Sequence, residues 1–305
     1  AFVADDGDNN IHLRDSETLG NTVGQNYNQY DVNKLYVDAF PQYVTPSGKR
    51  SPAVQNLFQE QLNQGVFLIN FMGHGSEVAW TSEDILNTNM INNLSNYDKL
   101  PLFVTATCEF GRFDNPNFQA GAEKLVTNPR GGAIAMLTTT RPVFSNTNFR
   151  LAKAFYNSIF EKKDGKYQRL GDIFKDTKNN SLDLVNRNFT LLGDPSMKLA
   201  YPEEEIKITR ITSNGQISTQ LKALEKVQVT GEIHSNSGLD TEFMGTVQIK
   251  VHDKSTKLIT FGDESVPIEY KDLKNIIFKG QARVSNGKFS FEFVVPKDIV
   301  YPVDL

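Results

Sequence analysis

Three apolar runs, residues 66–72, 101–107 and 133–139, constrain the fold of this chain more than any other feature. Each has the length of one strand, and each is apolar along its length rather than at alternate positions. This is typical of strands buried on both faces of a sheet. The segments around them carry helical patterns, as between Ser51 and Gln64. Strands that alternate with helices predict an α/β fold with a mostly parallel sheet flanked by helices.

Weaker patterns predict the remaining elements of this part of the chain. The stretch 9–33 is expected to be a loop with one short helix, because it is polar and rich in asparagine. The other expected elements are strands at 1–5 and 34–40 and helices at 52–64, 82–86, 120–126, 148–160 and 170–179.

Two residues with reactive side chains follow the buried strands. His74 stands in Gly73-His74-Gly75-Ser76 after the first run, and Cys108, the only cysteine of the chain, follows the second run. Sites in open α/β sheets lie beyond the carboxyl ends of the strands. Because neighbouring parallel strands end at one edge of the sheet, we expect His74 and Cys108 to lie close together.

A neighbouring cysteine and histidine can form a thiol nucleophile. The thiolate is the reactive form, and a histidine generates it by accepting the thiol proton. An acyl-transfer site also needs N–H groups directed at the developing oxyanion, for which the backbone N–H groups of Gly75 and Cys108 are our candidates. A lone cysteine is often only a small buried hydrophobe. The combination with His74 nevertheless predicts a His74–Cys108 dyad.

The pattern of the chain changes after residue 202. Apolar and polar residues then alternate, as in 227–233 and 289–293, and turn signals such as Asn-Gly separate these segments. We therefore expect two domains. Residues 1–202 form the α/β domain, without its N-terminal part, and residues 203–305 form an incomplete immunoglobulin-like β-sandwich. The chain is accordingly expected to be a fragment of a longer protein.

Composition and missing motifs argue against three classes of function. A net charge of −4 and a pI near 5.7 give no reason to expect nucleic-acid binding. No apolar run reaches the roughly 18 residues that a membrane span requires, so the fragment itself is expected to be soluble. A nucleotide-binding doubly wound protein is disfavoured, because no Gly-x-Gly-x-x-Gly follows a strand.

Several motifs resemble those of the gingipain-type (C25) peptidases, a family of caspase-like cysteine peptidases. An apolar strand before His-Gly and another before Ala-x-Cys form the general caspase-like pattern. Segments 138–143 and 188–195 further resemble the PorU-type sortases, or signal peptidases, of the type IX secretion system. The other matching segments are 4–10, 73–76 with Trp80, 107–114, 128–135 and, in the expected β domain, 278–280 and 294–298. The resemblance therefore extends over nearly the whole chain.

The resemblance implies a definite activity. PorU-type proteins cleave the C-terminal sorting domain from secreted cargo proteins and attach the cargo to a cell-surface glycolipid through a cysteine thioester. The implied partners are the cargo, an anionic lipopolysaccharide acceptor and a PorV-like outer-membrane protein. The implied location is the outer face of the outer membrane, reached through a partner. The alternative is a catalytically inert caspase-like scaffold that binds proteins in a secretion complex.

The resemblance also implies a third catalytic residue, an acid upstream of the histidine that orients it. Asp6, Asp15 and Glu17 are available for this role, and we favour Glu17. A solvated loop acid is the alternative interpretation of Glu17.

Other charged residues have weaker functional interpretations. Arg112 and Arg141 could bind substrate, and structural ion pairs are the alternative. No cofactor is expected. Asp5, Asp6 and Asp8 offer ligands for a structural calcium ion, but they lack the spacing of an EF-hand loop, so this ion is left unassigned.

Overall fold

The computed structural model describes residues 1–299, which divide into two compact units. The first unit comprises Ala1–Ala200 together with Ile259–Tyr270, and the second comprises Tyr201–Leu258 and the chain from Lys271 onward. The sequence predicts one boundary, after residue 202, and does not anticipate that residues 259–270 belong to the first unit. Residues 300–305, the end of the predicted β domain, lie outside the described residues.

A six-stranded sheet forms the centre of the first unit. Its strands are, in order across the sheet, β12 (Phe189–Leu192), β9 (Ala135–Thr139), β8 (Leu102–Ala106), β5 (Leu68–Met72), β1 (Phe2–Ala4) and β2 (Lys34–Tyr36). All neighbours are parallel except β12, which is antiparallel to β9. Every residue of β5, β8 and β9 is buried, because helices cover both faces. The predicted α/β fold is thereby confirmed.

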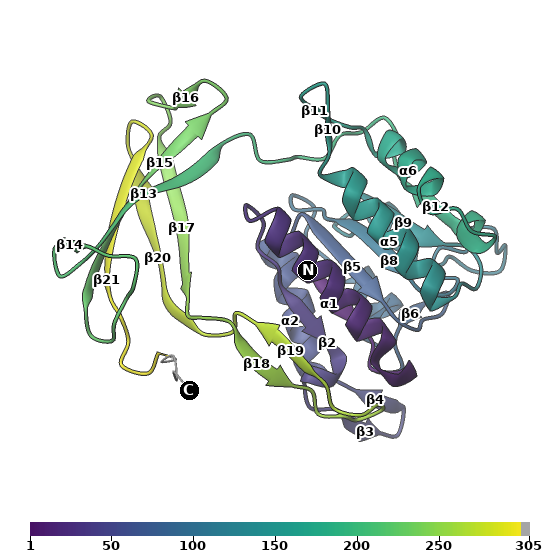
Figure 1. Ribbon diagram of the computed structural model, residues 1–305. Helices are drawn as coiled ribbons and strands as arrows, with labels where there is room; N and C mark the ends of the chain where they lie inside the picture. The colour runs from purple at the N-terminus through teal and green to yellow at the C-terminus, as the bar shows by residue number, and fades with distance from the viewer. Residues whose placement is uncertain (300–305) are drawn as a thin grey trace. The chain divides into compact units, whose positions relative to one another are not determined.

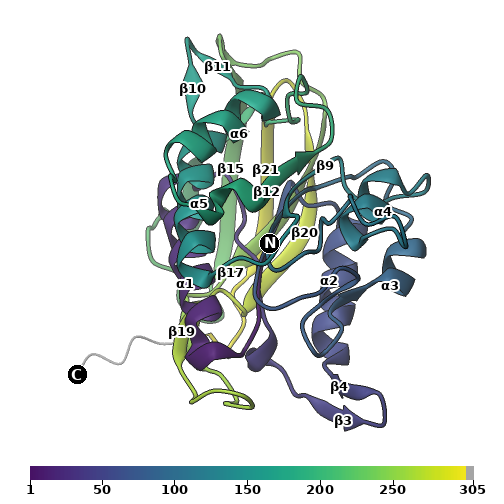
Figure 2. The same cartoon turned by 90° about the vertical axis from the view of Figure 1, so that its right-hand side faces the viewer.

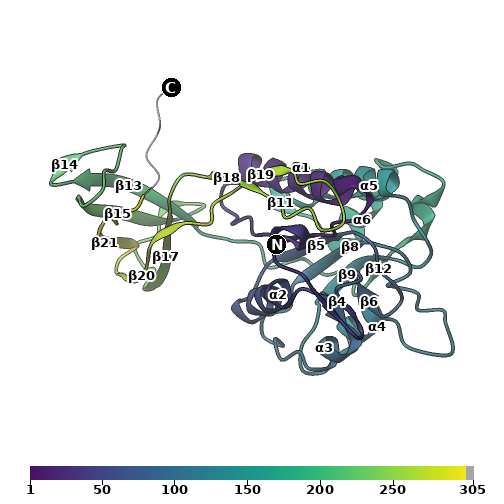
Figure 3. The ribbon, with the colours of Figure 1, turned by 90° about the horizontal axis from the view of Figure 1, so that it is seen from below.

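The helices lie in two layers, one on each face of this sheet (Figure 2, Figure 3). One layer contains α1 (Ile11–Asn26), α5 (Ser145–Ile159) and α6 (Leu170–Asn179), and the other contains α2 (Pro52–Gln64), α3 (Thr88–Asn92) and α4 (Gly121–Thr127). The core beneath the second layer is aromatic. Trp80 stacks on Phe71 with ring centroids 4.3 Å apart, and Phe58 meets the edge of Trp80.

The prediction for residues 9–33 is wrong, because α1 is a full helix of 16 residues. Its buried residues recur at helical spacing, but half of them are polar or glycine, so the sequence shows little apolar periodicity. The buried residues are His12, Leu13, Ser16, Leu19, Gly20 and Val23. The helix packs this mixed face against the sheet and α5.

The helix predicted at 82–86 is also absent. The segment is a turn between β6 (Ala79–Trp80) and β7 (Leu86–Asn87), in which Thr81 and Asp84 have φ of 57° and 55°. These left-handed conformations are incompatible with a helix. The smaller elements of the unit are β3 (Tyr43–Thr45), β4 (Gly48–Arg50), β10 (Lys162–Lys163), β11 (Lys166–Tyr167) and 3₁₀ turns at Asp8–Asn10, Val37–Ala39 and Val185–Asn188.

The second unit consists of antiparallel strands. One sheet contains β13 (Glu205–Ser213), β14 (Gln216–Ile217), β15 (Lys226–Ser235), β16 (Gly238–Leu239) and β21 (Lys288–Val294), and β17 (Gly245–His252) pairs with β20 (Ile276–Val284). Side chains from both groups share a core that includes Ile233, Val247, Val284 and Phe289. The immunoglobulin-like topology stays a prediction.

Residues 259–270 pack against the N-terminal part of the first unit. They form most of the hairpin between β18 (Thr256–Ile259) and β19 (Glu269–Asp272), whose loop reaches β3 and β4 (Figure 1). The buried carboxylate of Asp38 accepts backbone N–H groups from Gly262 and Asp263 at 2.9 Å. Lys49 forms ion pairs with Asp263 and Glu264. A distant part of the sequence thus completes the unit.

Within residues 1–299, no helix has both the length and the apolar character that crossing a membrane requires.

Candidate active site

His74 and Cys108 lie at equivalent places on neighbouring strands. In the parallel register of β5 and β8, Met72 is opposite Ala106. His74 and Cys108 each follow two residues beyond this pair, where the strands have ended. The N–H of Gly73 still donates to the Ala106 carbonyl at 3.4 Å. Both reactive residues therefore stand at the carboxyl edge of the sheet, on strands about 4.8 Å apart.

The loops that carry these residues touch each other. A Cβ atom at Gly75 would lie 2.5 Å from Thr107 Oγ1 and 3.0 Å from the Ala79 carbonyl oxygen. Gly75 follows His74, and Thr107 precedes Cys108, so glycine is what allows the two loops this approach. A Cβ at Gly73 would lie 2.4 Å from Asp5 Cβ on β1's loop. Close packing therefore requires glycine on both sides of His74.

Two aspartates hold His74 in place. The Asp5 carboxylate accepts the backbone N–H of His74 at 2.9 Å, and the Asp8 carboxylate accepts from the ring Nε2 at 3.1 Å. This arrangement leaves Nδ1 available to a thiol. The side chains of His74 and Asp8 are 58% and 57% exposed, so a substrate can reach them.

A strained turn presents Asp8 to His74. Asp8, Asn9 and Asn10 have φ of 53°, 55° and 62°, three successive left-handed residues. Asp and Asn adopt this conformation more readily than other residues, yet each instance costs energy and needs support. Residues of the β18–β19 loop supply the support: Asn10 donates to the Val266 carbonyl, and the Ser265 hydroxyl donates to the Asp6 carbonyl.

His12 shares Asp8 with His74. Its Nε2 lies 3.5 Å from Asp8 Oδ2, and its ring meets the His74 ring edge-on with centroids 5.1 Å apart. Burial and, to a smaller extent, the charge of His74 together lower the pKa of His12 to about 4, although the charge of Asp8 and its hydrogen bond act in the opposite direction. His12 is consequently neutral near pH 7, and the negative charge of Asp8 acts on His74.

Cys108 is partly buried in a loop that neighbouring side chains fix. The Thr139 hydroxyl donates to the Thr107 carbonyl, and Asn148 donates to the Ala106 carbonyl at 3.2 Å. The thiol itself donates to the Val143 carbonyl at 3.8 Å, and it makes no hydrogen bond to His74 within the described chain. Catalytic hydrogen bonds are often long or absent before substrate binds. The dyad accordingly stays a prediction with favourable placement.

The proposed oxyanion donors are free of internal acceptors. Among residues 1–299, neither the N–H of Gly75 nor that of Cys108 donates to a backbone or side-chain oxygen. The bridge between Gly75 and Trp80 is formed by their neighbours: the N–H of Thr81 donates to the His74 carbonyl, and the N–H of Ser76 donates to the Ala79 carbonyl. Both candidate donors are therefore available to a ligand.

The remaining predicted site residues have other partners. The Glu17 carboxylate forms an ion pair with Lys34 at 2.7 Å and accepts from the Tyr36 hydroxyl at 2.8 Å. The acid that contacts the ring of His74 is Asp8, for which the sequence suggests only a role as a calcium ligand. No local signal distinguishes Asp8, because its position depends on the left-handed turn and on residues 265 and 266 far along the chain.

The two arginines form ion pairs, which was the alternative interpretation of both. Arg112 pairs with Glu77 at 2.9 Å and with Glu109 at 3.2 Å. The guanidinium group of Arg141 donates hydrogen bonds to both carboxylate oxygens of Asp114. A substrate would have to compete with these carboxylates, so the geometry gives substrate binding by Arg112 or Arg141 no direct support.

Two groups of side chains near His74 have the composition of metal ligands. Asp8, His12 and His74 offer ligand atoms within 4.8 Å of one another, as do the buried Asp5, Asp6 and Glu83. Two residues of the second group, Asp5 and Asp6, are among those that the sequence offers as ligands of a calcium ion. The expectation of no cofactor remains a prediction.

Replacing Asp6 by Asn is expected to flatten the pH dependence of stability between about pH 4 and pH 7. Burial, together with the charges of Glu83, Asp5 and Glu264, raises the pKa of Asp6 from 3.8 to about 7, although the hydrogen bond from the Gln42 amide opposes this rise. A carboxyl with a raised pKa stabilises the fold below its unfolded pKa, and this contribution is lost as the pH rises through about 7. The slope is at most about 1.4 kcal/mol per pH unit.

Urea denaturation of both proteins at several pH values measures this difference. The wild-type free energy of unfolding should fall more steeply with rising pH than that of Asp6→Asn. Parallel curves would show that Asp6 is ionised throughout the range.

Comparison with known proteins identifies the family. Residues 1–200, about two thirds of the chain, match the model of peptidase family C25. The chain belongs to this family, whose gingipain-like members are cysteine peptidases. Gingipain R2 of Porphyromonas gingivalis is 24% identical over 267 residues, which cover 81% of this chain and 32% of that protein. Gingipain R1 of the same species is 23% identical over 312 residues, covering 90% and 29%. The chain thus spans about a third or less of the curated relatives it matches.

Solved structures show the same fold. The crystal structure of the Arg-specific cysteine proteinase gingipain R aligns with a TM-score of 0.53 and 18% identity, over 97% of this chain and 60% of that one. The complex of Porphyromonas gingivalis RgpB pro- and mature domains gives 0.53 and 17%, over 97% and 61%. At a sequence identity below 20%, these two structures show only that the chain has the same fold.

Proposed function

We propose that this chain is the catalytic part of a cysteine endopeptidase in which Cys108 is the nucleophile and His74 the proton acceptor. The observation that carries the proposal is the placement of both residues two positions beyond the Met72–Ala106 pair of adjacent parallel strands. Membership of peptidase family C25 supports it. The contact of Asp8 with His74 Nε2 supports it further, since an acid at this nitrogen orients the ring.

In the first step, a peptide bond of the substrate is broken. The Cys108 thiol transfers its proton to His74 Nδ1, and the thiolate attacks the scissile carbonyl carbon. The carbonyl oxygen becomes an oxyanion, which the N–H groups of Gly75 and Cys108 can stabilise. The C–N bond then breaks, the leaving amine takes the proton from His74, and a thioester to Cys108 remains.

In the second step, an acceptor releases the product. Water or an amine loses a proton to His74 and attacks the thioester carbonyl, and the Cys108 thiolate leaves and is reprotonated. Water yields a free carboxylate, whereas an amine yields a new amide bond. Asp8 has one role in both steps: its negative charge stabilises the imidazolium and fixes the ring so that Nδ1 faces the thiol.

The proposed biological role is that of a sortase of the type IX secretion system. In this role the enzyme cleaves the C-terminal sorting domain from secreted cargo and transfers the cargo to an anionic lipopolysaccharide at the outer face of the outer membrane. A PorV-like outer-membrane protein is the proposed partner. The support for this role is the sequence resemblance of segments 138–143 and 188–195 to PorU-type sortases.

Trapping the thioester tests the proposal. The full-length protein is incubated with a cargo protein that carries its sorting domain, in the presence of hydroxylamine, and the new carboxyl end is analysed by mass spectrometry. A thioester intermediate yields a hydroxamate at that end, and prior alkylation of Cys108 should abolish the product. Cleavage that continues after complete alkylation would refute the thiol mechanism. A free carboxylate formed even with excess amine acceptor would refute the transferase role and leave the peptidase.

A further inference from the structure

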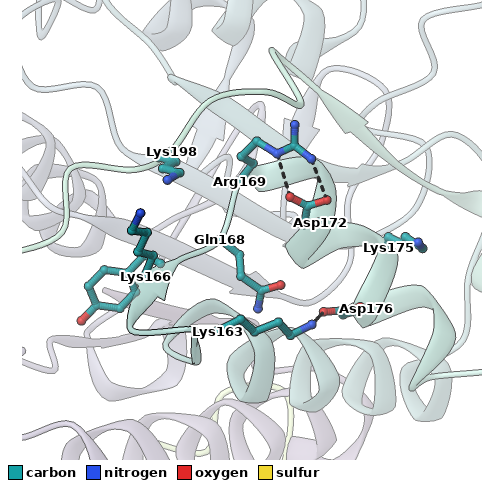
Figure 4. Close-up of a pocket in the computed structure, with 9 residues that line it drawn as sticks. Lys163, Lys166, Gln168, Arg169, Asp172, Lys175, Asp176 and Lys198 are labelled. Carbon is teal, nitrogen blue, oxygen red and sulfur yellow. Dashed lines mark hydrogen bonds and ion pairs between the residues drawn. The ribbon is translucent and has the colours of Figure 1, made fainter.

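A cavity of about 430 Å³ lies in the first unit beside the β10–β11 hairpin and the start of α6 (Figure 4). It is lined by Lys163, Lys166, Tyr167, Gln168, Arg169, Asp172, Lys175, Asp176 and Lys198. Its volume is in the range of small-molecule sites. Five of the lining residues are cationic and two are acidic, in a chain whose net charge is −4.

This cavity is separate from the candidate active site. Because β12 is antiparallel to β9, Leu192 lies opposite Met136, near the start of β9. A Cβ at Gly193 would lie 2.6 Å from Ala135 Cβ, so the segment that leads to Lys198 begins at the amino edge of the sheet. His74 and Cys108 lie at the carboxyl edge. A role in the proposed peptide cleavage therefore does not explain the basic lining.

Three of the five cations form no ion pair within the described chain. Arg169 pairs with Asp172 at 2.7 Å, and Lys163 pairs with Asp176. No carboxylate of the described chain lies within ion-pair distance of the other three, which are exposed at the cavity. These are Lys166, Lys175 and Lys198. Figure 4 shows Lys166 and Lys198 on one side of Gln168 and Lys175 on the other. The cavity thus presents unpaired positive charge at two places.

Gln168 adds a buried donor without an acceptor. The residue is only 8% exposed, and its Nε2 atom has no hydrogen-bond partner among the described residues. Figure 4 shows the amide between the Arg169–Asp172 and Lys163–Asp176 pairs. A buried donor left unsatisfied destabilises the fold. An oxygen atom of a bound ligand would provide the missing acceptor.

Two main-chain donors at the start of α6 are already used. The N–H of Leu170 donates to the Met197 carbonyl and the N–H of Gly171 to the Pro195 carbonyl, both at 2.8 Å. These bonds hold the Lys198 segment against the helix. The side chains, rather than the helix N-terminus, are therefore the groups that would recognise a ligand.

We propose that this cavity binds a small ligand with at least two anionic oxygen groups, such as phosphates. Lys166 and Lys198 bind one group, Lys175 binds the other, and the Gln168 amide donates to an oxygen between them. A phosphorylated small molecule and the headgroup of an anionic lipid share this chemistry. The site goes beyond the proposed peptidase function and does not depend on it.

Calorimetric titration with inorganic pyrophosphate tests the site on the full-length protein at low ionic strength. We expect one binding site in the wild type. Lys166→Ala combined with Lys198→Ala should weaken binding by about tenfold or more, because two charged contacts to the ligand are lost. Gln168→Met, which removes the donor and keeps the volume, should also weaken it. Lys153→Ala is the matched control, because Lys153 is an exposed lysine on α5 outside the lining, and it should bind as the wild type does.

The results separate the outcomes. Absence of binding in the wild type, or an equal loss in Lys153→Ala, would overturn the proposal. Co-sedimentation with phosphatidylglycerol vesicles identifies the source of the ligand. If the wild type binds these vesicles and the double lysine variant does not, the ligand is a lipid headgroup. If the wild type binds pyrophosphate but not the vesicles, the ligand is a free small molecule. Cleavage of cargo should be unchanged in the double lysine variant, so this result is independent of the peptidase tests.

Discussion

Replacing Cys108 by Ala in the full-length protein is expected to abolish release of the sorting domain from cargo, by about 10⁴-fold or more. Cys108 is the only cysteine of the 305 residues, so no second thiol in this chain can substitute for it. Its side chain is small and only partly buried, with one weak hydrogen bond to the Val143 carbonyl. The change should therefore leave the fold intact, which thermal unfolding can verify.

Arg141→Ala provides the matched control for this experiment. The Arg141–Asp114 pair is on the surface, with side chains 44% and 46% exposed. Solvent screens such exposed pairs, so they contribute little to stability, and a purely structural Arg141 predicts activity within a few fold of the wild type. Cargo release that persists in Cys108→Ala would favour the inert scaffold over the peptidase. A large loss in Arg141→Ala would restore its role in substrate binding.

Replacing Asp8 by Asn is expected to lower kcat for cargo cleavage by about 10²–10⁴-fold with little change in KM. The amide keeps the shape of the side chain but cannot stabilise the His74 imidazolium, and its NH2 group can force the wrong tautomer on the ring. His12 cannot compensate, because burial keeps its pKa near 4 and leaves it neutral. The 3.1 Å contact between Asp8 and His74 Nε2 is the basis for this effect.

Glu17→Gln is the comparison that decides between the two acids. Glu17 is on α1 with Lys34 and Tyr36 as partners, so its replacement should alter stability slightly and kcat little. Steady-state kinetics of both variants and of the wild type, over a range of pH, give the answer. A large loss of kcat in Glu17→Gln with normal activity in Asp8→Asn would return the orienting role to Glu17.

The sequence was informative wherever one strong local pattern determined the structure. The three apolar runs became β5, β8 and β9, because strands buried on both faces need apolar residues throughout. The rule that sites follow the carboxyl ends of parallel strands then placed His74 and Cys108 at one edge. Helices α2 and α6 have the bounds that the patterns predicted. These features depend on residues that are close together in the sequence.

The sequence was uninformative where the structure depends on distant contacts. The buried face of α1 includes His12 and Ser16, whose burial depends on what the sheet and α5 present to them, so apolar periodicity could not reveal the helix. Asp8 reaches His74 only through a left-handed turn. That turn is supported by the β18–β19 loop, more than 200 residues further along the chain. Neither the buried face of α1 nor the position of Asp8 can therefore be predicted from the residues that are near it in the sequence.

The membership of residues 259–270 in the first unit bears on the order in which the protein matures during synthesis. Domains generally begin to fold from the N-terminus while the ribosome is still adding residues. The sheet that carries His74 and Cys108 needs nothing beyond β12, which ends at Leu192. The turn that presents Asp8 acquires Ser265 and Val266 only later. We therefore expect the nucleophile and the base to be assembled on the nascent chain before the acid is fixed, so that full activity is reached only when translation has passed the β18–β19 hairpin.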